Sequence, residues 1–161
     1  MKRSEVDDSL IPGIWFAEYS YAGAKGSMNK LQTTMEYFEN GRYRVDGQQA
    51  VTAYEQGRKF ELIYGLTSVG DWRVSGRGLL ITSGPIKSDL LSLKDGSQPI
   101  DISQIPQSEI RKHFRFIDEV LLPGTSERFE IVQLGKDHMH LRAHDHVGGS
   151  FEFDVTRVIR K

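Results

Sequence analysis

The sequence predicts a mainly β protein folded as an antiparallel, up-and-down β-barrel of about eight strands. Three observations predict this fold: apolar and polar residues alternate with a period of two, glycine-containing turns separate the alternating segments, and only one segment has a helical period. The 161 residues fit one domain, which we place at 13–161, after a flexible N-terminal segment at 1–12. Closure into a barrel would also remove exposed strand edges.

The first predicted hairpin is centred on Asn40-Gly41. Residues 31–37 alternate between apolar and polar side chains, and Tyr43 continues the apolar face after the turn. Asn and Gly both tolerate a positive φ, which a two-residue hairpin turn requires. The other strands are expected at 14–21, 51–54, 59–66, 70–74, 79–82, 128–134, 138–143 and 150–158.

One amphipathic helix is expected near residues 109–122. Its apolar stripe consists of Ile110, Phe114, Ile117 and Leu121. Ser108 is the expected N-cap and Pro123-Gly124 the expected stop. Residues 83–106 are less regular and contain three prolines, counting Pro106.

Gly13, Trp15 and Arg157 are expected to close one end of the barrel. Gly13-Ile14-Trp15 opens the first strand, and Arg157 lies in the last one. A guanidinium stacked on an indole ring is a favourable cation–π contact of about 1 kcal/mol. This role is structural rather than catalytic. A glycine turn before a core tryptophan is the simpler alternative.

The chain resembles the calycin superfamily, which includes lipocalins and fatty-acid-binding proteins, and within it the ToxS-type regulatory proteins. The resemblance is carried by Trp15, Phe38–Tyr43, Gly70–Ser75, Leu79–Thr82 and Glu127–Val132. It implies a lipocalin-like β-barrel and a regulatory protein partner of the ToxR type. ToxS-type proteins have an N-terminal membrane anchor, which this sequence lacks as written, so the resemblance leaves the location and the partner open.

Composition narrows the classes of function. The formal charge of −1, from 21 basic and 22 acidic residues, argues against a nucleic-acid partner. The absence of cysteine excludes disulfides, thiolate catalysis and cysteine-based zinc sites. Residues 1–8 are mostly charged and no apolar run follows, so we expect no membrane span. The expected location is cytoplasmic as written, or periplasmic if an anchor or signal was removed.

The leading hypothesis is a non-enzymatic domain that binds a small hydrophobic or amphipathic ligand inside the barrel. Its candidate ligand-binding residues are Tyr37, Tyr43, Phe60, Leu62, Met139, Leu141 and Phe153. Alternatively, these side chains fill the core, and the domain acts through its outer surface as a regulatory protein–protein interaction module. The sequence has no phosphate-loop spacing and no Gly-x-Ser-x-Gly nucleophile elbow, so neither a cofactor nor an enzymatic activity is expected.

A second alternative is a metal-binding protein or metal-dependent enzyme that uses His138 and His140. On an extended strand these two histidines share a face and lie about 7 Å apart. A His-x-His pair supplies two zinc ligands, and the third would come from His144, His146 or an aspartate. The residues on the opposite face are apolar. A solvent-facing surface strand is therefore the favoured interpretation of this segment.

Overall fold

The computed structural model describes residues 6–23, 26–144 and 148–159. In this part of the chain the strands are β1 (Gly13–Ala22), β2 (Met28–Tyr37), β3 (Arg42–Glu55), β4 (Arg58–Ser75), β5 (Gly78–Asp95), β6 (Gln98–Ile100), β7 (Ser126–Leu134), β8 (His138–His144) and β9 (Ser150–Arg157). The helical segments are η1 (Asp8–Leu10), α1 (Gln107–His113) and α2 (Ile117–Val120). None of the described helices is long and apolar enough to cross a membrane.

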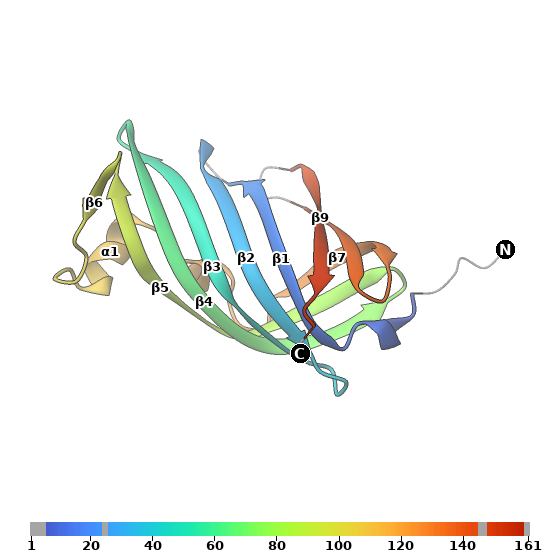
Figure 1. Cartoon of the computed structure of the whole chain (residues 1–161). Helices are drawn as coiled ribbons and strands as arrows, with labels where there is room; N and C mark the ends of the chain where they lie inside the picture. Colours follow the sequence, from blue (N-terminus) through green and yellow to red (C-terminus); the bar gives the residue numbers. More distant parts are fainter. Residues whose placement is uncertain (1–5, 24–25, 145–147, 160–161) are drawn as a thin grey trace.

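The strands form a closed antiparallel barrel (Figure 1). Their order is β4-β3-β2-β1-β9-β8-β7-β5, and pairing between β4 and β5 closes the ring. The short strand β6 extends the sheet beyond β5 as a hairpin. The predicted up-and-down barrel is therefore confirmed. Its closing contact brings β1 beside β9, where Trp15 pairs with Arg157.

Strands β3, β4 and β5 are longer than predicted. The sequence predicts a break after residue 66 and irregular structure from residue 83, whereas β4 and β5 each run without interruption for 18 residues. The pairing of β4 with β5 has two register shifts, at Ile63/Tyr64 and at Ser68/Gly70, and the second coincides with the predicted break. A β-bulge bends a strand without ending it, so the glycine-rich signal marks bends in continuous strands.

Gly70 lies at the second register shift, in close contact with β5. A Cβ at this position would overlap the carbonyl oxygen of Thr82. Only glycine allows the two backbones to approach so closely, and the strands bend here as a consequence. Figure 1 shows both strands curving along their length from the β6 side of the barrel toward their shared turn.

The helical segment predicted near residues 109–122 is present, but it is divided. The structure has two short helices, and the N-cap of α1 is Pro106 instead of Ser108. The chain is extended at Phe114 and Phe116, which separates the helices. These two aromatic residues are placed against the barrel by the break. Their ring centroids lie 5.3 Å from Phe60 and 4.8 Å from Tyr64, respectively.

Buried apolar side chains form two separate clusters. The closed-end core is centred on Trp15, Ile131, Met139 and Val155, all of which are completely buried. The helix-side core consists of Leu62, Tyr64, Leu90, Leu93, Ile110 and Phe116. The helices therefore contribute a second core of their own on one side of the barrel.

The packed part of the chain begins before residue 13. Asp7 caps the short helix η1 by accepting a hydrogen bond from the backbone N–H of Ser9. Ile11 follows and is completely buried in the closed-end core. The predicted flexible segment at 1–12 therefore includes residues that fold onto the barrel.

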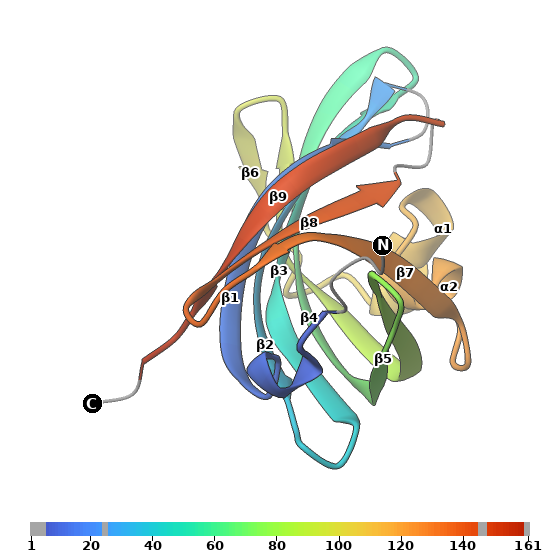
Figure 2. The ribbon, with the colours of Figure 1, turned by 90° about the vertical axis from the view of Figure 1, so that its right-hand side faces the viewer.

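The helical segment covers an edge of β5 that β7 leaves unpaired. Strand β7 pairs with β5 only between Gly78 and Thr82. Farther along β5, the Asp118 carboxylate accepts a hydrogen bond from the backbone N–H of Ser88. Arg111 Nη2 donates a hydrogen bond to the carbonyl oxygen of Ser88 at 3.2 Å. Arg111 and Asp118 also form an ion pair at 2.7 Å. Figure 2 shows α1 and α2 on this side of the barrel, near β5 and β7.

Candidate functional site

One end of the barrel is closed by Trp15 and Arg157. The Arg157 guanidinium carbon lies 4.3 Å from the Trp15 ring centroid. Arg157 also donates hydrogen bonds to the carbonyl oxygens of Lys136 at 2.8 Å, Pro12 at 2.9 Å and Leu10. The arginine thus joins the last strand to the N-terminal segment and covers the indole ring.

Gly13 accommodates this arrangement. Its φ is +134°, a value that side-chain-bearing residues rarely adopt, and a Cβ would overlap Nη1 of Arg157. Trp15 Nε1 donates a hydrogen bond to the Ile11 carbonyl oxygen at 2.8 Å, so the buried indole leaves no polar group unsatisfied. Trp15 and Ile11 are completely buried at the closed end as a result.

The other end of the interior carries aromatic side chains that keep some solvent exposure. Tyr19 and Tyr21 of β1 follow Trp15 and Ala17 on the inward face, yet both are only half-buried. Phe151 of β9 is half-buried in the same way. Phe129 and Phe153 complete this group of five residues, which we call the aromatic wall. On β1 and β9, these inward-facing rings are therefore more exposed than Trp15 and Val155 at the closed end.

The rings of the aromatic wall are stacked on one another. The Tyr19 and Phe153 centroids lie 4.2 Å apart, and those of Tyr21 and Phe151 lie 5.5 Å apart with an interplanar angle of 9°. Phe129 meets Phe153 edge-on at 6.2 Å. Residues from three strands therefore form one continuous aromatic surface, which suits contact with a flat or apolar molecule.

A carboxylate lies next to this surface. Glu127 of β7 pairs with the inward-facing Ile81 and precedes Phe129 by two residues, which places both on the inward face. The pKa of Tyr21 is raised to about 12, first by burial and then by the charge of Glu127, while a hydrogen bond with Gln49 acts in the opposite direction. The Glu127 charge therefore acts on the interior of the barrel.

The same carboxylate influences two further tyrosines. Burial is the main cause of the raised pKa of Tyr19 and of Tyr43, and the charge of Glu127 contributes to both. Gln49, which is buried, also donates a hydrogen bond from Nε2 to Oδ1 of Asn29 at 3.0 Å. The interior therefore combines aromatic rings with a small number of polar groups, as small-molecule sites usually do.

The predicted ligand-binding residues all occupy buried or half-buried positions. Most belong to the closed-end core, namely Tyr37, Tyr43, Met139, Leu141 and Phe153. Leu62 belongs to the helix-side core, and the half-buried Phe60 packs against it. The structure therefore distributes these residues over two cores, and of the seven only Phe153 lies in the aromatic wall.

The other members of the candidate site were not among the residues predicted from the sequence. Tyr19 and Tyr21 alternate with Glu18 and Ser20 in a predicted strand, so the period-two pattern could have found them. Glu127 could not have been found in this way, because the sequence predicts a strand that begins only at residue 128. Its inward position depends on pairing with β5.

His138 and His140 belong to a charged ladder on the outside of the barrel. Both contact Oδ1 of Asp154, at 2.8 Å from His138 Nε2 and 2.7 Å from His140 Nδ1. Glu152 continues the ladder, with its Oε1 3.4 Å from His140 Nε2 and 3.2 Å from Arg142 Nη2. The last contact joins Arg142 Nη1 to Glu130 at 3.0 Å.

The charged ladder does not provide a metal centre within the described part of the chain. No group of three or more His, Asp or Glu side chains there is arranged to hold a metal ion. Of the histidines predicted as a third metal ligand, His144 is exposed at the end of β8. His146 lies outside the described residues.

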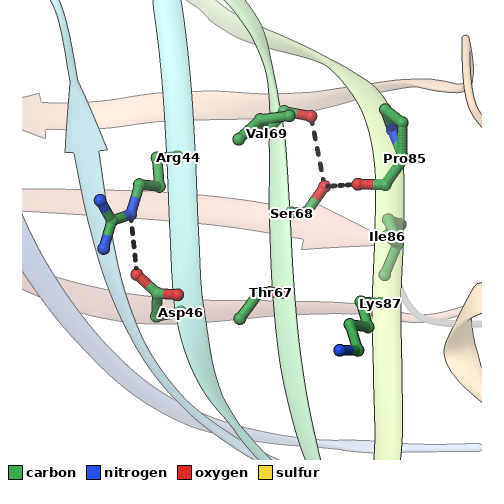
Figure 3. Close-up of a pocket in the computed structure, with 8 residues that line it drawn as sticks. All are labelled: Arg44, Asp46, Thr67, Ser68, Val69, Pro85, Ile86 and Lys87. Carbon is green, nitrogen blue, oxygen red and sulfur yellow. Dashed lines mark hydrogen bonds and ion pairs between the residues drawn. The ribbon is translucent and has the colours of Figure 1, made fainter.

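A shallow depression of about 260 Å³ lies on the outside of β3, β4 and β5 (Figure 3). Its polar groups contact one another: Arg44 Nε lies 3.0 Å from Asp46 Oδ2, and Ser68 Oγ lies 3.2 Å from the Pro85 carbonyl oxygen. The remaining lining residues are Thr67, Val69, Ile86 and Lys87. None of the predicted ligand-binding residues lines this depression, so it is separate from the aromatic wall.

The closed barrel of eight antiparallel strands, with β6 as an addition, is consistent with a lipocalin-like fold. No model of a protein family matches the chain, and no curated protein matches its sequence.

Proposed function

We propose that this protein binds a small hydrophobic or amphipathic molecule at the open end of its barrel, against the aromatic wall. The observation that carries the proposal is the gradient of exposure along the inward faces of β1 and β9. Trp15 and Val155 are completely buried at the closed end, whereas Tyr21 and Phe151 remain half-buried on the same two strands. A ligand that covered these rings would gain about 25 cal/mol for each Å² of apolar surface removed from water.

A buried hydroxyl group provides secondary support. Ser88 Oγ is shielded from solvent and has no hydrogen-bond partner among the described residues. Ser88 pairs with Leu66, whose side chain belongs to the closed-end core. An unsatisfied buried hydroxyl costs about 1–3 kcal/mol. An amphipathic ligand with a polar group near β5 would relieve that cost.

We further propose that the chain is related to the calycins. The support is the contact between Trp15 and Arg157 at the closed end, together with the closed order of the strands. The likeness to ToxS-type regulators suggests, as an alternative, that the outer surface binds a regulatory protein. Ligand binding requires the aromatic wall, whereas binding of a regulatory protein to the outer surface does not. One experiment therefore separates the two functions.

The test is binding of phenylnaphthylamine, an uncharged fluorescent probe, to the purified protein. We expect saturable binding that Phe151→Ala weakens about tenfold, or ~1.4 kcal/mol, because the substitution removes a half-buried ring of the aromatic wall. Thr156→Ala is the matched control, since Thr156 lies on the outer face of the same strand. It should bind like the wild type.

Absence of saturable binding, or an equal effect of the two substitutions, would overturn the proposal. The outer surface would then be the better candidate, as the regulatory alternative requires. Circular dichroism of each variant shows whether the barrel is still folded, so that weaker binding can be assigned to the aromatic wall.

A further inference from the structure

The helical segment at 107–120 places two aromatic rings against the interior side of β4. Phe116 is 1% exposed and meets the inward-facing Tyr64 edge-on, with ring centroids 4.8 Å apart. Phe114 is half-buried and meets Phe60 of the same strand at 5.3 Å. An aromatic ligand would make contacts of the same kind with these two side chains of the barrel.

The surface that these rings cover continues the inward face of the aromatic wall. Tyr19 of β1 pairs with Leu31 of β2. Leu31 pairs with Gln49 of β3, which in turn pairs with Tyr64 of β4. Side chains paired in this way lie on the same face of a sheet. In the ring of eight strands, β5 is four positions from β1, and β4 is four positions from β9. The helical segment therefore lies across the interior from β1 and β9 (Figures 1 and 2).

A polar contact at the edge of β5 holds the middle of the helical segment. The Asp118 carboxylate accepts a hydrogen bond from the N–H of Ser88, and Arg111 Nη2 donates one to the Ser88 carbonyl oxygen at 3.2 Å. Arg111 and Asp118 form an ion pair at 2.7 Å, and both side chains are partly exposed. The pair supplies the acceptor and the donor that a neighbouring strand would supply. We call this contact the latch.

The two ends of the helical segment are held by other contacts. Before α1, the chain is attached through the pairing of β6 with β5. After α2, the Gly124 N–H donates to the Ser83 carbonyl oxygen at 2.7 Å, and the Ser83 N–H donates to the Thr125 carbonyl oxygen at 2.9 Å. Helices of seven and four residues have little stability of their own. Opening of the latch would therefore release the middle of the segment while both ends stay attached.

We infer that the helical segment is a displaceable occupant of the barrel: Phe114 and Phe116 cover a second apolar binding surface, and an apolar or aromatic group of the ligand takes their place when the latch opens. This surface consists of Phe60, Leu62, Tyr64, Leu90 and Leu93. Phe60 and Leu62 are two of the ligand-binding residues predicted from the sequence. The inference rests on the proposed ligand-binding function and adds regulation of the site by the segment.

Displacement predicts the sign of the effect of a weaker latch. A ligand that binds only the open form has an apparent Kd equal to its intrinsic Kd divided by the fraction of open protein. A variant that opens the latch more often should therefore bind the ligand more tightly. If the segment only supports the barrel, a weaker latch leaves the affinity unchanged or lowers it.

The first measurement is a titration of phenylnaphthylamine against the wild type, Asp118→Asn and Glu109→Gln. We expect Asp118→Asn to bind the probe about fivefold more tightly than the wild type, because it raises the open fraction. Glu109→Gln is the matched control, since Glu109 lies on the same segment and pairs with Lys112 outside the latch. It should bind like the wild type.

The second measurement is amide hydrogen exchange in the wild type, followed by NMR with and without saturating probe. The Ser88 N–H is bonded to Asp118, so its exchange reports opening of the latch. Val155 is completely buried in β9, so its exchange reports unfolding of the barrel. We expect the probe to accelerate exchange at Ser88 about tenfold or more, without accelerating exchange at Val155.

The outcomes distinguish this inference from the proposed function. If the probe binds but does not accelerate exchange at Ser88, or if Asp118→Asn does not tighten binding, the segment is not displaced and ligand binding stands. If the probe binds saturably to neither the wild type nor Asp118→Asn, the proposed function fails and this inference fails with it. Faster exchange at Ser88 with the probe, together with tighter binding by Asp118→Asn alone, would support both.

Discussion

Arg157 joins the two ends of the chain through its guanidinium group. Its contacts reach the Trp15 ring, the N-terminal carbonyl oxygens of Leu10 and Pro12, and the β7–β8 turn at Lys136. A hydrogen bond that involves a charged group contributes about 1.5–3 kcal/mol to stability. The contact between the guanidinium and the ring adds about 1 kcal/mol. One side chain therefore stabilises the closed end of the barrel.

Replacing Arg157 should destabilise the protein more than replacing an arginine on the outer face. For Arg157→Ala we expect the free energy of unfolding to fall by about 2–3 kcal/mol, measured by urea denaturation. Arg142→Ala is the control, because the ion pairs of Arg142 with Glu130 and Glu152 are exposed and should contribute less than about 1 kcal/mol. Equal losses in the two variants would contradict the role assigned to Arg157.

At the same scale, the sequence identified some residues of the interior and missed others. Trp15 and Arg157 were predicted as a pair, and the structure places the guanidinium over the ring. Tyr19 followed from the alternation in the first strand but was not selected. Glu127 has no signal of its own, because an acidic residue at the start of a strand usually faces solvent. Only its pairing with Ile81 turns it inward.

At the scale of elements, the helical segment replaces a missing strand neighbour. Beyond the short pairing with β7, an edge of β5 would expose its backbone groups, which is a recognised hazard of edge strands. Arg111 and Asp118 bind the carbonyl oxygen and the N–H of Ser88, respectively. Arg111 also lies over the Phe116 ring, at 3.9 Å from its centroid. The ion pair thus attaches the helices to the sheet edge.

Asp118→Asn should loosen this attachment. The hydrogen bond to Arg111 is the first cause of the lowered pKa of Asp118, so loss of the charge weakens the contact. We expect the free energy of unfolding to fall by about 1–2 kcal/mol and amide hydrogen exchange to increase in residues 107–120. Hydrogen exchange with mass spectrometry provides the measurement.

The control for this experiment is Glu109→Gln on the same segment. Glu109 pairs with Lys112 at 2.7 Å, but both side chains are at least half-exposed, so the change should be within about 0.5 kcal/mol. Unchanged exchange in Asp118→Asn would show that apolar packing alone holds the helices against β5.

At the scale of the whole molecule, the charged ladder makes stability depend on pH. The hydrogen bond with Asp154 is the first cause of the raised pKa of His140, and the bonds with His140 and His138 lower the pKa of Asp154. A raised histidine pKa stabilises the fold fully below the ordinary value of 6.5, and the effect is lost as pH rises through the raised value. The Asp154 contribution is present above 3.8 and is lost as pH falls through its lowered pKa.

We therefore expect the ladder to stabilise the protein most between about pH 4 and pH 6.5. The urea midpoint should decrease as the pH rises above 6.5, and Asp154→Asn should reduce that decrease. Asp71→Asn is the control, since Asp71 pairs with Arg42 instead of a histidine. A wild-type pH dependence in Asp154→Asn would mean that the ladder does not contribute.

The predicted architecture was confirmed, while the lengths of its elements were not. Alternation identified nearly every strand, but a break was predicted between residues 66 and 70 and irregular structure from residue 83, although both segments lie within the continuous strands β4 and β5. The stripe from Ile110 to Leu121 predicted one helix, and the contacts of Phe114 and Phe116 with the barrel divide it into two. Tertiary contacts override local periodicity at these positions, because packing stabilises short helices more than propensity does.

The sequence by itself determined that the chain is an antiparallel barrel with an apolar interior, because a period of two fixes which side chains share a face. It also determined that His138 and His140 face away from Met139 and Leu141. The tertiary structure decided which end of the interior is closed and which carries the half-buried aromatic rings of β1 and β9. It also decided that Glu127 faces them, because these relations depend on strand register and closure, which pair residues far apart in the chain.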